Sequence, residues 1–519
     1  MKRIILRKDS YYDSVFLMLI STEVKKMEGV TEAVVAMGTE MNLELIGDMG
    51  MGGSELDAAG PNDLIIALKA EKKAILDEAE SAVEELLSKK AQQGSDAAYR
   101  HTSTAAALEA LPESNLVVVS VPGEHAPREV RKALRADKHV MLFSDNVSLE
   151  EEIKLKALAR ERGLLLMGPD CGTAIINGKP ICFANVVNTG GIGVVSASGT
   201  GLQEVTSLIS RMGGGISQGI GTGGRDLKSE KVGGSTTLMA IEALAKDPET
   251  VAIAVVSKPP AASVAEKVVA ALGKAGKPAV VHLIGMEKRP TRGNLHYAGN
   301  LEETARMAVS LAAGKPCRTQ VFDADEKEIE AILERETNAI GSRQKYLRGY
   351  FTGGTLTDEA VFVLNETLGG IYSFDPADPA FKLSDPHVSR KHTIVDLGED
   401  VFTVGRPHPM IDPSTRTDRM KQEIDDGEIA LVMIDCVIGY GSHPDPAGAV
   451  APAIRAMKSA AEKRGAYLTV VASITGTDGD FQNFAAQKRT LEEAGAVVMP
   501  SNYQAAELAK HIMIRLNSR

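Results

Sequence analysis

The sequence of 519 residues contains no tryptophan, and only 4% of its residues are aromatic. So few large rings argue against an aromatic-packed β-sandwich, whereas abundant Ala, Val, Gly and Ile favour parallel α/β layers. The apolar run VFLMLI at residues 15–20 is too short to span a bilayer, and the N-terminus has no signal-peptide core. We therefore expect an α/β protein that is neither exported nor inserted in a membrane.

Basic stripes and paired cysteines are also missing. The net charge is −11, which argues against a nucleic-acid partner, although a local cationic spot could receive a small anionic molecule. The four cysteines are scattered without a CxxC pair, which is typical of a reduced, cytoplasmic protein. Because the acidic residues are isolated, with no helix-spaced His pair and no calcium-loop signature, the sequence predicts no metal site.

The length predicts three or four domains, and alternating strand and helix patterns place their boundaries. The predicted parts are an N-terminal α/β module at 1–98, a Rossmann-like domain at 99–188, an α/β unit at 189–315, a connector at 316–345 and an α/β unit at 346–519. The strands predicted in the first two parts are 3–7, 31–37, 63–68, 115–121, 139–143 and 163–167.

Two segments have the pattern of a buried strand that runs into a small-residue turn and then a helix. They are GIGVVSASGTG at residues 191–201 and ALVMIDCVIGYGS at residues 430–442. Free backbone N–H groups at a helix N-terminus bind anions, so two such ends indicate a phosphate or phosphoryl group between paired helix dipoles. Alternatively, these glycines only permit tight turns or close strand–helix packing.

Several motifs resemble known families. GPDCGT at 168–173, GIGVVSASGT at 191–200 and GIGTGG at 219–224 are similar to the α subunit of succinyl-CoA synthetase and other NDP-forming acyl-CoA synthetases. DLGED at 396–400 and residues 434–442 resemble the ligase domain of that family's β subunit. With GRPHPMIDP at 405–413, the whole chain resembles the FdrA family. The resemblance implies a Rossmann-like domain of CoA-binding type and two flavodoxin-like ligase domains of succinyl-CoA-synthetase type.

In acyl-CoA synthetases of this type, two helices point their N-termini at a phosphorylated histidine. Carried over by motif, the phosphate-binding residues are Ser198, Gly199 and Thr200 at the start of one helix, and Gly439, Gly441 and Ser442 near the start of another. The connector leaves no room for the family's ATP-grasp module, so ATP chemistry would need a partner. Only the turn VPGEH at 121–125 remains of the family's CoA site, which leaves CoA binding open.

His296 and Lys258 are candidate catalytic residues. His296 falls near the family's His-Ala-Gly motif, which Tyr297 interrupts here. An imidazole can accept a phosphoryl group when a carboxylate orients its other nitrogen, but SKPP at 257–260 stands where the family has that Glu. Lys258 would instead attract an anion at the C-terminal end of a strand, where open α/β sheets bind ligands. The structural alternatives are a packing histidine and a surface lysine.

Arg406 and His408 complete the catalytic candidates. They lie in a segment that several prolines stiffen, which lowers the entropy cost of presenting them at fixed positions. Arg406 suits bidentate binding of a carboxylate or phosphate, and His408 suits proton transfer or a hydrogen bond to a carbonyl. The alternative is a rigid loop in which Arg406 and Asp412 form a structural salt bridge.

Three functions fit these residues. The FdrA resemblance implies a subunit of a phosphate-dependent carbamoyltransferase complex of purine and allantoin breakdown, which converts oxalurate and phosphate into oxamate and carbamoyl phosphate. The second function is an acyl-CoA synthetase, an acid–CoA ligase with a phosphohistidine and a separate ATP-grasp subunit. The third is a non-catalytic scaffold. We expect an oligomeric, cytoplasmic enzyme that works with other subunits on phosphate, an acyl phosphate or carbamoyl phosphate.

Overall fold

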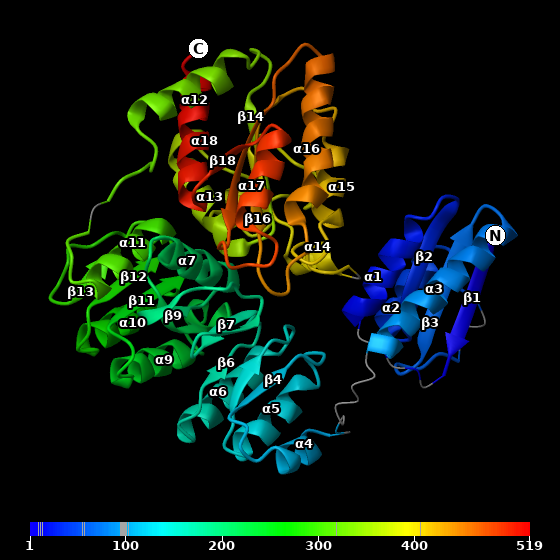
Figure 1. Ribbon diagram of the computed structural model, residues 1–519, viewed down its shortest axis with the longest axis horizontal. Helices are drawn as coiled ribbons and strands as arrows, with labels where there is room; N and C mark the ends of the chain where they lie inside the picture. The colour runs from blue at the N-terminus through cyan, green and yellow to red at the C-terminus, as the bar shows by residue number, and fades with distance from the viewer. Residues whose placement is uncertain are drawn as a thin grey trace. The chain divides into compact units, whose positions relative to one another are not determined.

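The computed structural model describes residues 1–519 except Asp9, Tyr11, Asp13, Ser54, Glu55, Asp57, residues 94–100, Thr102, Arg318 and Gly405 (Figure 1). The chain forms two compact units. One contains Met1–His101 and Asp400–His408, and the other contains Thr102–Glu399 and Pro409–Arg519. Among the described residues, no helix combines the length and the apolar composition that a membrane span requires.

The N-terminal unit is built on an antiparallel sheet of order β1-β3-β2. Its elements are β1 (Lys2–Arg7), α1 (Ser14–Lys25), β2 (Val30–Met37), α2 (Glu40–Asp48), β3 (Leu64–Ala70) and α3 (Lys73–Gln93). Apolar residues of α1 and α3 cover one face of the sheet, and Ile46 of α2 packs with Ile65 on the other. The central strand β3 is therefore buried along almost its whole length. The sequence pattern missed α2, which Thr39 caps by accepting a hydrogen bond from Asn42 N.

A three-stranded parallel sheet of order β4-β5-β6 opens the second unit. Its elements are α4 (Thr104–Ala110), β4 (Leu116–Val119), α5 (Ala126–Arg135), β5 (His139–Leu142), α6 (Leu149–Glu161) and β6 (Leu166–Met167). The predicted strands 115–121 and 163–167 are shorter in the structure, because residues 115, 120–121 and 163–165 lie outside the strands. Parallel strands joined by helices confirm the Rossmann-like expectation for this sheet.

The next sheet has seven strands in the order β13-β12-β11-β9-β10-β7-β8. Its strands are β7 (Thr173–Ile176), β8 (Lys179–Cys182), β9 (Thr189–Ser196), β10 (Ile216–Gly221), β11 (Ala252–Ser257), β12 (Ala279–Leu283) and β13 (Leu295–Tyr297). The hairpin β7-β8 adds to β10 in antiparallel fashion. The other five strands are parallel and have the flavodoxin-like order, in which the first strand lies between the second and the third.

The helices of this domain divide between the two faces of its sheet. Residues of α7 (Gly199–Arg211) and α11 (Leu301–Ala312) pack in one apolar cluster. Residues of α8 (Arg225–Lys228), α9 (Ser235–Lys246) and α10 (Ala262–Lys274) pack in another. Such two-sided cover explains why the central strands β9 and β11 are runs of buried aliphatic residues.

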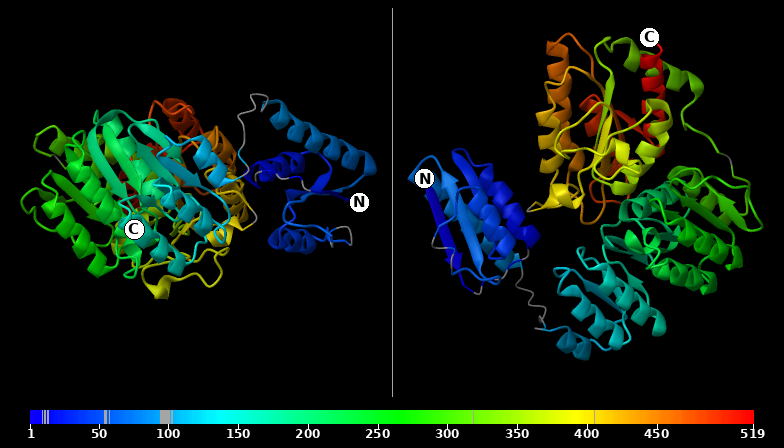
Figure 2. Two further views of the ribbon diagram at one scale, coloured as in Figure 1. Left: turned by 90° about the horizontal axis from the view of Figure 1, so that it is seen from below. Right: turned by 180° about the vertical axis from the view of Figure 1, so that it is seen from behind.

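The C-terminal sheet repeats the flavodoxin-like order, β15-β14-β16-β17-β18, with all strands parallel. The strands are β14 (Tyr346–Phe351), β15 (Thr393–Asp396), β16 (Ile429–Val437), β17 (Thr469–Thr475) and β18 (Val497–Met499). The helices are α12 (Glu326–Asn338), α13 (Gly354–Leu368), α15 (Ser414–Gln422), α16 (Pro446–Lys463), α17 (Phe484–Glu493) and α18 (Asn502–Asn517). As Figures 1 and 2 show, α13 and α18 lie on one face and α15 and α16 on the other. Both ligase-type folds that the sequence predicted are thereby confirmed.

The two flavodoxin-like domains pack through the same face of each sheet. One continuous apolar cluster contains residues of α7 and α11 from the first domain and of α13 and α18 from the second, including Leu208, Ala305, Leu356 and Leu508. Two glutamates cross this interface reciprocally. Glu204 of α7 accepts a hydrogen bond from Asn502 N at the start of α18 (3.1 Å), and Glu359 of α13 accepts one from Leu301 N at the start of α11 (2.8 Å).

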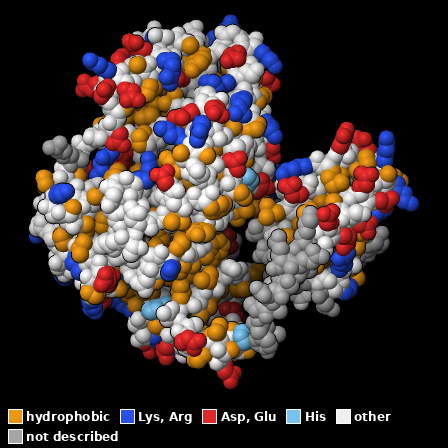
Figure 3. Space-filling model, viewed as in Figure 1, with side chains coloured by type: hydrophobic (Ala, Val, Ile, Leu, Met, Phe, Trp, Pro, Cys, Tyr) orange, Lys and Arg blue, Asp and Glu red, His pale blue; other side chains and the backbone are white. Residues whose placement is uncertain are grey.

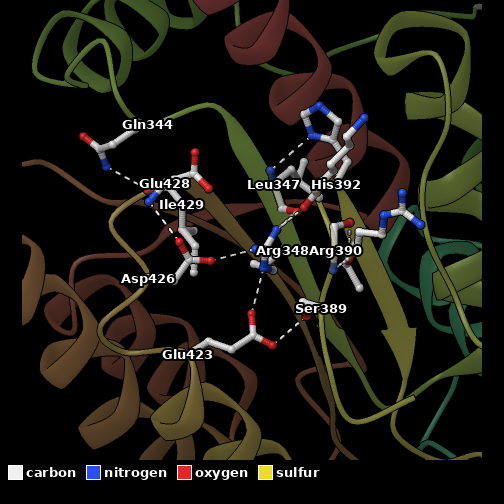
Figure 4. Close-up of polar contacts among 12 residues, drawn as sticks. Gln344, Leu347, Arg348, Ser389, Arg390, His392, Glu423, Asp426, Glu428 and Ile429 are labelled. Carbon is white, nitrogen blue, oxygen red and sulfur yellow. Dashed lines mark hydrogen bonds and ion pairs between the residues drawn. The ribbon is translucent and has the colours of Figure 1, made fainter. Parts of the chain in front are cut away.

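A buried ion network fixes the beginning of β14 (Figure 4). Arg348 is only 3% exposed, and it donates to Glu423 Oε2 (2.7 Å), Asp426 Oδ2 (2.7 Å) and the carbonyl of Lys391. This cluster lies near the start of β14, whereas α13 follows the end of that strand. We therefore assign it to the alignment of β14 and not to the candidate site.

Charged side chains are mixed on the surface. On the face drawn in Figure 3, the Lys and Arg side chains of the described residues are interspersed with Asp and Glu. The described part of this face therefore offers no continuous basic stripe.

The Glu359 contact predicts how stability depends on pH. Burial, assisted by the nearby Glu204 and Glu302, raises the pKa of Glu359 to about 8. Between the ordinary carboxyl pKa and pH 8 the unfolded chain loses this proton while the folded chain keeps it, so the free energy of unfolding falls as pH rises. We expect Glu359→Gln to remove about 3 kcal/mol of this fall between pH 5 and pH 9, measured as urea midpoints.

The matched control is Glu366→Gln, because Glu366 is an exposed carboxylate on the same helix α13. The control should follow the wild-type pH dependence. If the free energy of unfolding changed equally with pH in all three proteins, the raised pKa of Glu359 would be contradicted.

Candidate functional site

The first predicted strand–turn–helix segment has the expected form. Strand β9 ends at Ser196, Ser198 is the N-cap, and α7 begins at Gly199. Ser198 Oγ accepts a hydrogen bond from Gly201 N (3.3 Å), while Ser196 Oγ accepts one from Ser198 N (3.1 Å). The serines thus fix the turn, and the first N–H groups of α7 point beyond the C-terminal edge of the sheet.

The second predicted helix start is wrong. Strand β16 ends at Val437, but the next helix, α16, begins only at Pro446, after the N-cap Asp445. Gly439 and Gly441 have φ values of +115° and +81°, outside the right-handed helical region. They turn the chain so that Tyr440 N can donate to Ala184 O (2.8 Å). No helix begins at this turn, so a helix N-terminus does not support phosphate binding by Gly439, Gly441 and Ser442, which stays a prediction.

The helix that meets α7 is α13. The hydroxyls of Ser198 and Thr355 are hydrogen-bonded to each other. A Cβ on Gly353, the N-cap of α13, would lie 2.9 Å from Thr200 Cγ2, and one on Gly201 would lie 3.0 Å from Thr355 Cγ2. The N-termini of the two helices are therefore in contact, and the missing side chains at Gly353 and Gly201 allow this approach.

A shared sequence pattern could have indicated that α7 and α13 are paired. Both helices begin with Gly-Thr and carry Glu at the sixth position, as in Gly199-Thr200 with Glu204 and Gly354-Thr355 with Glu359. Asp435 of β16 holds the turn before α13, because Thr352 N donates to both of its carboxylate oxygens (2.9 and 3.0 Å). Arg416 in turn pairs with Asp435 at 2.9 Å.

Lys258 lies where the sequence predicted, immediately after β11. A Cβ on Gly354 would be 2.3 Å from Lys258 Nζ and 2.6 Å from Asp396 Oδ2, so an ammonium and a carboxylate converge on the first residue of α13. Asp358 Oδ2 lies 3.9 Å from Lys258 Nζ. Sequence reasoning named Asp396 only as part of a motif and missed Asp358 altogether.

The charges at this point perturb one another. Burial alone lowers the pKa of Lys258, but the negative charges of Asp358, Asp396, Glu399 and Asp170 outweigh it and raise the pKa. Burial raises the pKa of Asp396 to about 7, against the opposing effect of Lys258. At neutral pH the site therefore holds a charged lysine beside a carboxyl group that can gain or lose a proton.

The start of α7 has different surroundings. Thr173 is 1% exposed, and its Oγ1 has no hydrogen-bond partner. That oxygen would lie 3.1 Å from a Cβ on Gly199, so it points at the first turn of α7. Hydroxyl groups and open backbone N–H groups meet here, which is the donor set that an oxyanion needs.

His296 is not brought to this junction. It lies in the middle of β13 at the edge of the sheet, in register with Val280, and through β12 and β11 with Val194 of β9. A strand spacing of about 4.8 Å places His296 and Val194 roughly 14 Å apart. Its Nδ1 contacts Thr291 Oγ1 at 3.3 Å. The geometry supports the packing alternative over a phosphohistidine.

Arg406 and His408 belong to the segment Asp400–His408 of the N-terminal unit, whereas Lys258 and the helix junction belong to the other unit. Arg406 is exposed, and burial lowers the pKa of His408 to about 4. A histidine with so low a pKa is neutral at physiological pH. Their predicted catalytic roles stay predictions.

The remnant of the CoA site does not fit a nucleotide cradle. A Cβ on Gly123 would lie 2.3 Å from Asp145 O and 2.5 Å from Asn146 C. This glycine is therefore required by the neighbouring loop of the chain itself. CoA binding stays a prediction.

Two family models match parts of the chain. The model described as "AllF, heavy metal-associated domain" matches residues 1–106, and the model described as "CoA-ligase" matches residues 350–512. The residues of the first match do not fit a thiolate metal site, because positions 1–106 contain no cysteine. Among the described residues, no group of three or more His, Cys, Asp or Glu side chains is placed to hold a metal ion.

Among curated proteins, the chain is 44% identical over 514 residues to the uncharacterized protein YahF of Escherichia coli K12, covering 99% of both chains. It is also 27% identical over 150 residues to a succinate–CoA ligase [ADP-forming] subunit alpha 2 of Archaeoglobus fulgidus. That match covers 28% of this chain and 50% of the ligase subunit.

Solved structures match at lower identity. An ATP citrate lyase of Methanothrix soehngenii, in complex with citrate and coenzyme A, matches 44% of each chain with 19% identity and a TM-score of 0.35. A dinucleotide-forming acetyl-coenzyme A synthetase of Candidatus Korarchaeum cryptofilum matches 78% of this chain and 84% of its own with 13% identity and a TM-score of 0.31.

Because Lys258 and Asp396 both lie next to Gly354, a methyl group added at this position should disturb both side chains. Gly354→Ala would displace the flexible end of Lys258 and the carboxylate of Asp396, while the backbone φ of Gly354 is ordinary for any residue. We expect a change of less than about 1 kcal/mol in the free energy of unfolding but at least a tenfold loss of turnover in the assembled enzyme. Gly427→Ala is the control, because nothing lies within 4 Å of the added Cβ.

The position of His296 predicts that it is dispensable. His296→Asn keeps a polar group that can still hydrogen-bond to Thr291, so turnover in the assembled enzyme should stay within twofold of the wild type. Radioactive phosphate should not enter the protein in an acid-labile form. If the wild type incorporated radioactive phosphate while His296→Asn did not and was inactive, the prediction would be contradicted, because His296 would then carry the phosphoryl group.

Proposed function

Because the chain belongs to the FdrA family, as its full-length likeness to YahF and its CoA-ligase region show, we propose that it is the phosphate-binding subunit of a carbamoyltransferase complex. The reaction would convert oxalurate and phosphate into oxamate and carbamoyl phosphate. The proposal places the chain in purine or allantoin catabolism, together with other subunits.

The observation that carries this proposal is the contact between the N-termini of α7 and α13. Two helix ends in contact add their partial positive charges, and their first N–H groups lack intrahelical partners. The unpartnered hydroxyl of Thr173 adds a donor directed at Gly199. A phosphate oxygen at this point would satisfy these groups together, and Ser198 and Thr200 would line the same position.

Lys258 supports the transfer of a carbamoyl group to that phosphate. Its ammonium lies at the start of α13, where it would bind the carbonyl oxygen of the carbamoyl donor. A hydrogen bond from a cation stabilises the negative charge that develops on this oxygen as the phosphate attacks. Carbamoyl phosphate would then leave toward a partner subunit.

The alternative is an acyl-CoA ligase with a phosphohistidine and an ATP-grasp module on another chain. The likeness of part of the chain to the succinate–CoA ligase subunit of Archaeoglobus fulgidus favours it. Two observations argue against the ligase. His296 lies on the edge strand β13, and Gly123 is required for close packing against the loop at residues 145–146. The two functions separate in one assay of the assembled complex: phosphate-dependent release of oxamate and carbamoyl phosphate without CoA supports the transferase, and CoA-dependent use of ATP supports the ligase.

Thr173 provides a direct test of the phosphate site. Thr173→Val removes a hydroxyl that has no partner in the protein, so the variant should unfold at the same urea concentration as the wild type or a slightly higher one. Its dissociation constant for inorganic phosphate, measured by titration calorimetry, should rise about tenfold, because a hydrogen bond to a charged group is lost.

Thr337→Val is the matched control, because the hydroxyl of Thr337 donates to Leu333 O within its own helix (2.7 Å). It should bind phosphate as the wild type does. Equal affinities for wild type and Thr173→Val would remove the start of α7 from the phosphate site.

A further inference from the structure

Asp396 occupies an unusual position for a carboxyl group. It ends β15 and accepts a hydrogen bond from Gly398 N through Oδ1 (2.9 Å), while Oδ2 points at the start of α13. The side chain is therefore held by its own turn on one side and presented to the helix junction on the other. A group oriented in this way has a fixed position relative to anything bound between α7 and α13.

The charged groups around Asp396 come from three elements. Lys258 follows β11, Glu399 follows β15, and Asp435 lies on β16. Lys258 favours the ionised form of Asp396, and the two carboxylates favour the protonated form. Burial is the largest of these influences and raises the pKa of Asp396 to about 7. Both protonation states are therefore populated at neutral pH.

Asp435 shows the contrasting arrangement. Its carboxylate accepts hydrogen bonds from the amide and hydroxyl of Thr352 and pairs with Arg416, and both charged residues are at most 2% exposed. Asp435 is thus enclosed by the protein and serves the turn before α13. Asp396 is partly exposed, and its Oδ2 lies beside Lys258 at the accessible start of that helix.

We propose that Asp396 is a catalytic residue of the carbamoyl transfer, and that its carboxyl group gives a proton to the nitrogen atom of the leaving amide. The inference rests on the function proposed above. An amide nitrogen is a poor leaving group unless it is protonated as the carbon–nitrogen bond breaks, so the reaction requires an acid within reach of that nitrogen. Asp396 Oδ2 and Lys258 Nζ both lie at Gly354 of α13, so a donor whose carbonyl oxygen binds Lys258 would have Asp396 beside it.

Atoms and electrons are conserved in this step. An oxygen of hydrogen phosphate forms a bond to the carbamoyl carbon, and the bond between that carbon and the amide nitrogen breaks. The electron pair of the broken bond stays on nitrogen, which receives the proton of Asp396 and leaves as the free amide. The proton that hydrogen phosphate sheds restores the carboxyl group. The net products are carbamoyl phosphate and the amide, with no change in oxidation state.

The test compares two carbamoyl donors in the assembled complex. Oxalurate needs a proton on its leaving nitrogen, whereas p-nitrophenyl carbamate releases a phenolate that leaves without one. We expect Asp396→Asn to lower kcat for oxalurate on the order of 10²–10⁴-fold and to leave kcat for the aryl carbamate within a few-fold of the wild type. Asp375→Asn is the control, because Asp375 is an exposed carboxylate paired with Lys228 at 3.2 Å. It should resemble the wild type with both donors.

A pH profile provides the second readout. The protonated carboxyl is the active form, so kcat for oxalurate should fall as the pH rises above about 7. Lys258→Met removes the cation that lowers the pKa of Asp396, so the falling limb should move to higher pH. This shift is a property of the coupled pair, and a residue that only supports the fold would not produce it.

The outcomes separate the two claims. If Asp396→Asn turned over oxalurate as fast as the wild type, the role of Asp396 would be overturned and the proposed function would stand. The same holds if the fall of kcat with rising pH occurred at the same pH in Lys258→Met as in the wild type. Equal losses with both donors would also overturn it, because they would show that Asp396 positions the site instead of supplying a proton. A wild-type complex that releases no carbamoyl phosphate from oxalurate would overturn the proposed function itself.

Discussion

The contact between the N-termini of α7 and α13 is the constraint on which the rest of the second unit depends. Each helix carries about half a positive charge at this end, so the two ends repel each other unless negative groups or bound anions lie between them. The apolar cluster between the flavodoxin-like domains holds them together in spite of this repulsion. The cross-bonds of Glu204 and Glu359 then fix which turn of each helix faces the other.

The two helix ends are related by topology but differ in chemistry. Both helices follow the first of five parallel strands that have the same order in each sheet, so both ends lie at a topological switch point, where such sheets bind ligands. At α13, the carboxyl groups of Asp396 and Asp358 lie close to the ammonium of Lys258. At α7, the hydroxyl of Thr173 and backbone N–H groups of the first turn lack hydrogen-bond acceptors. The repeated fold thus places carboxyl groups at one helix end and hydroxyl groups at the other.

Much of this arrangement could be predicted from the sequence. Aliphatic strands that end in small-residue turns indicated parallel sheets, and the run ending at Ser196 located α7 correctly. The second helix was misplaced because Gly439 and Gly441 have the composition of a phosphate loop, whereas their positive φ values only turn the chain toward residue 184. Periodicity does not report such backbone angles.

The convergence of Lys258 and Asp396 on Gly354 was beyond sequence reasoning for a different reason. Lys258 lies about a hundred positions or more before Gly354 and Asp396 and in the other flavodoxin-like domain, so only the packing of one domain on the other brings the three residues together. Since Lys258 follows a strand of the first domain while Asp396 and Gly354 belong to the second, neither domain alone can set the pKa of Asp396. A shift between the two domains would separate the lysine from the carboxyl and alter its protonation. The protonation of Asp396 is therefore coupled to the same interface that holds the two helix ends in place.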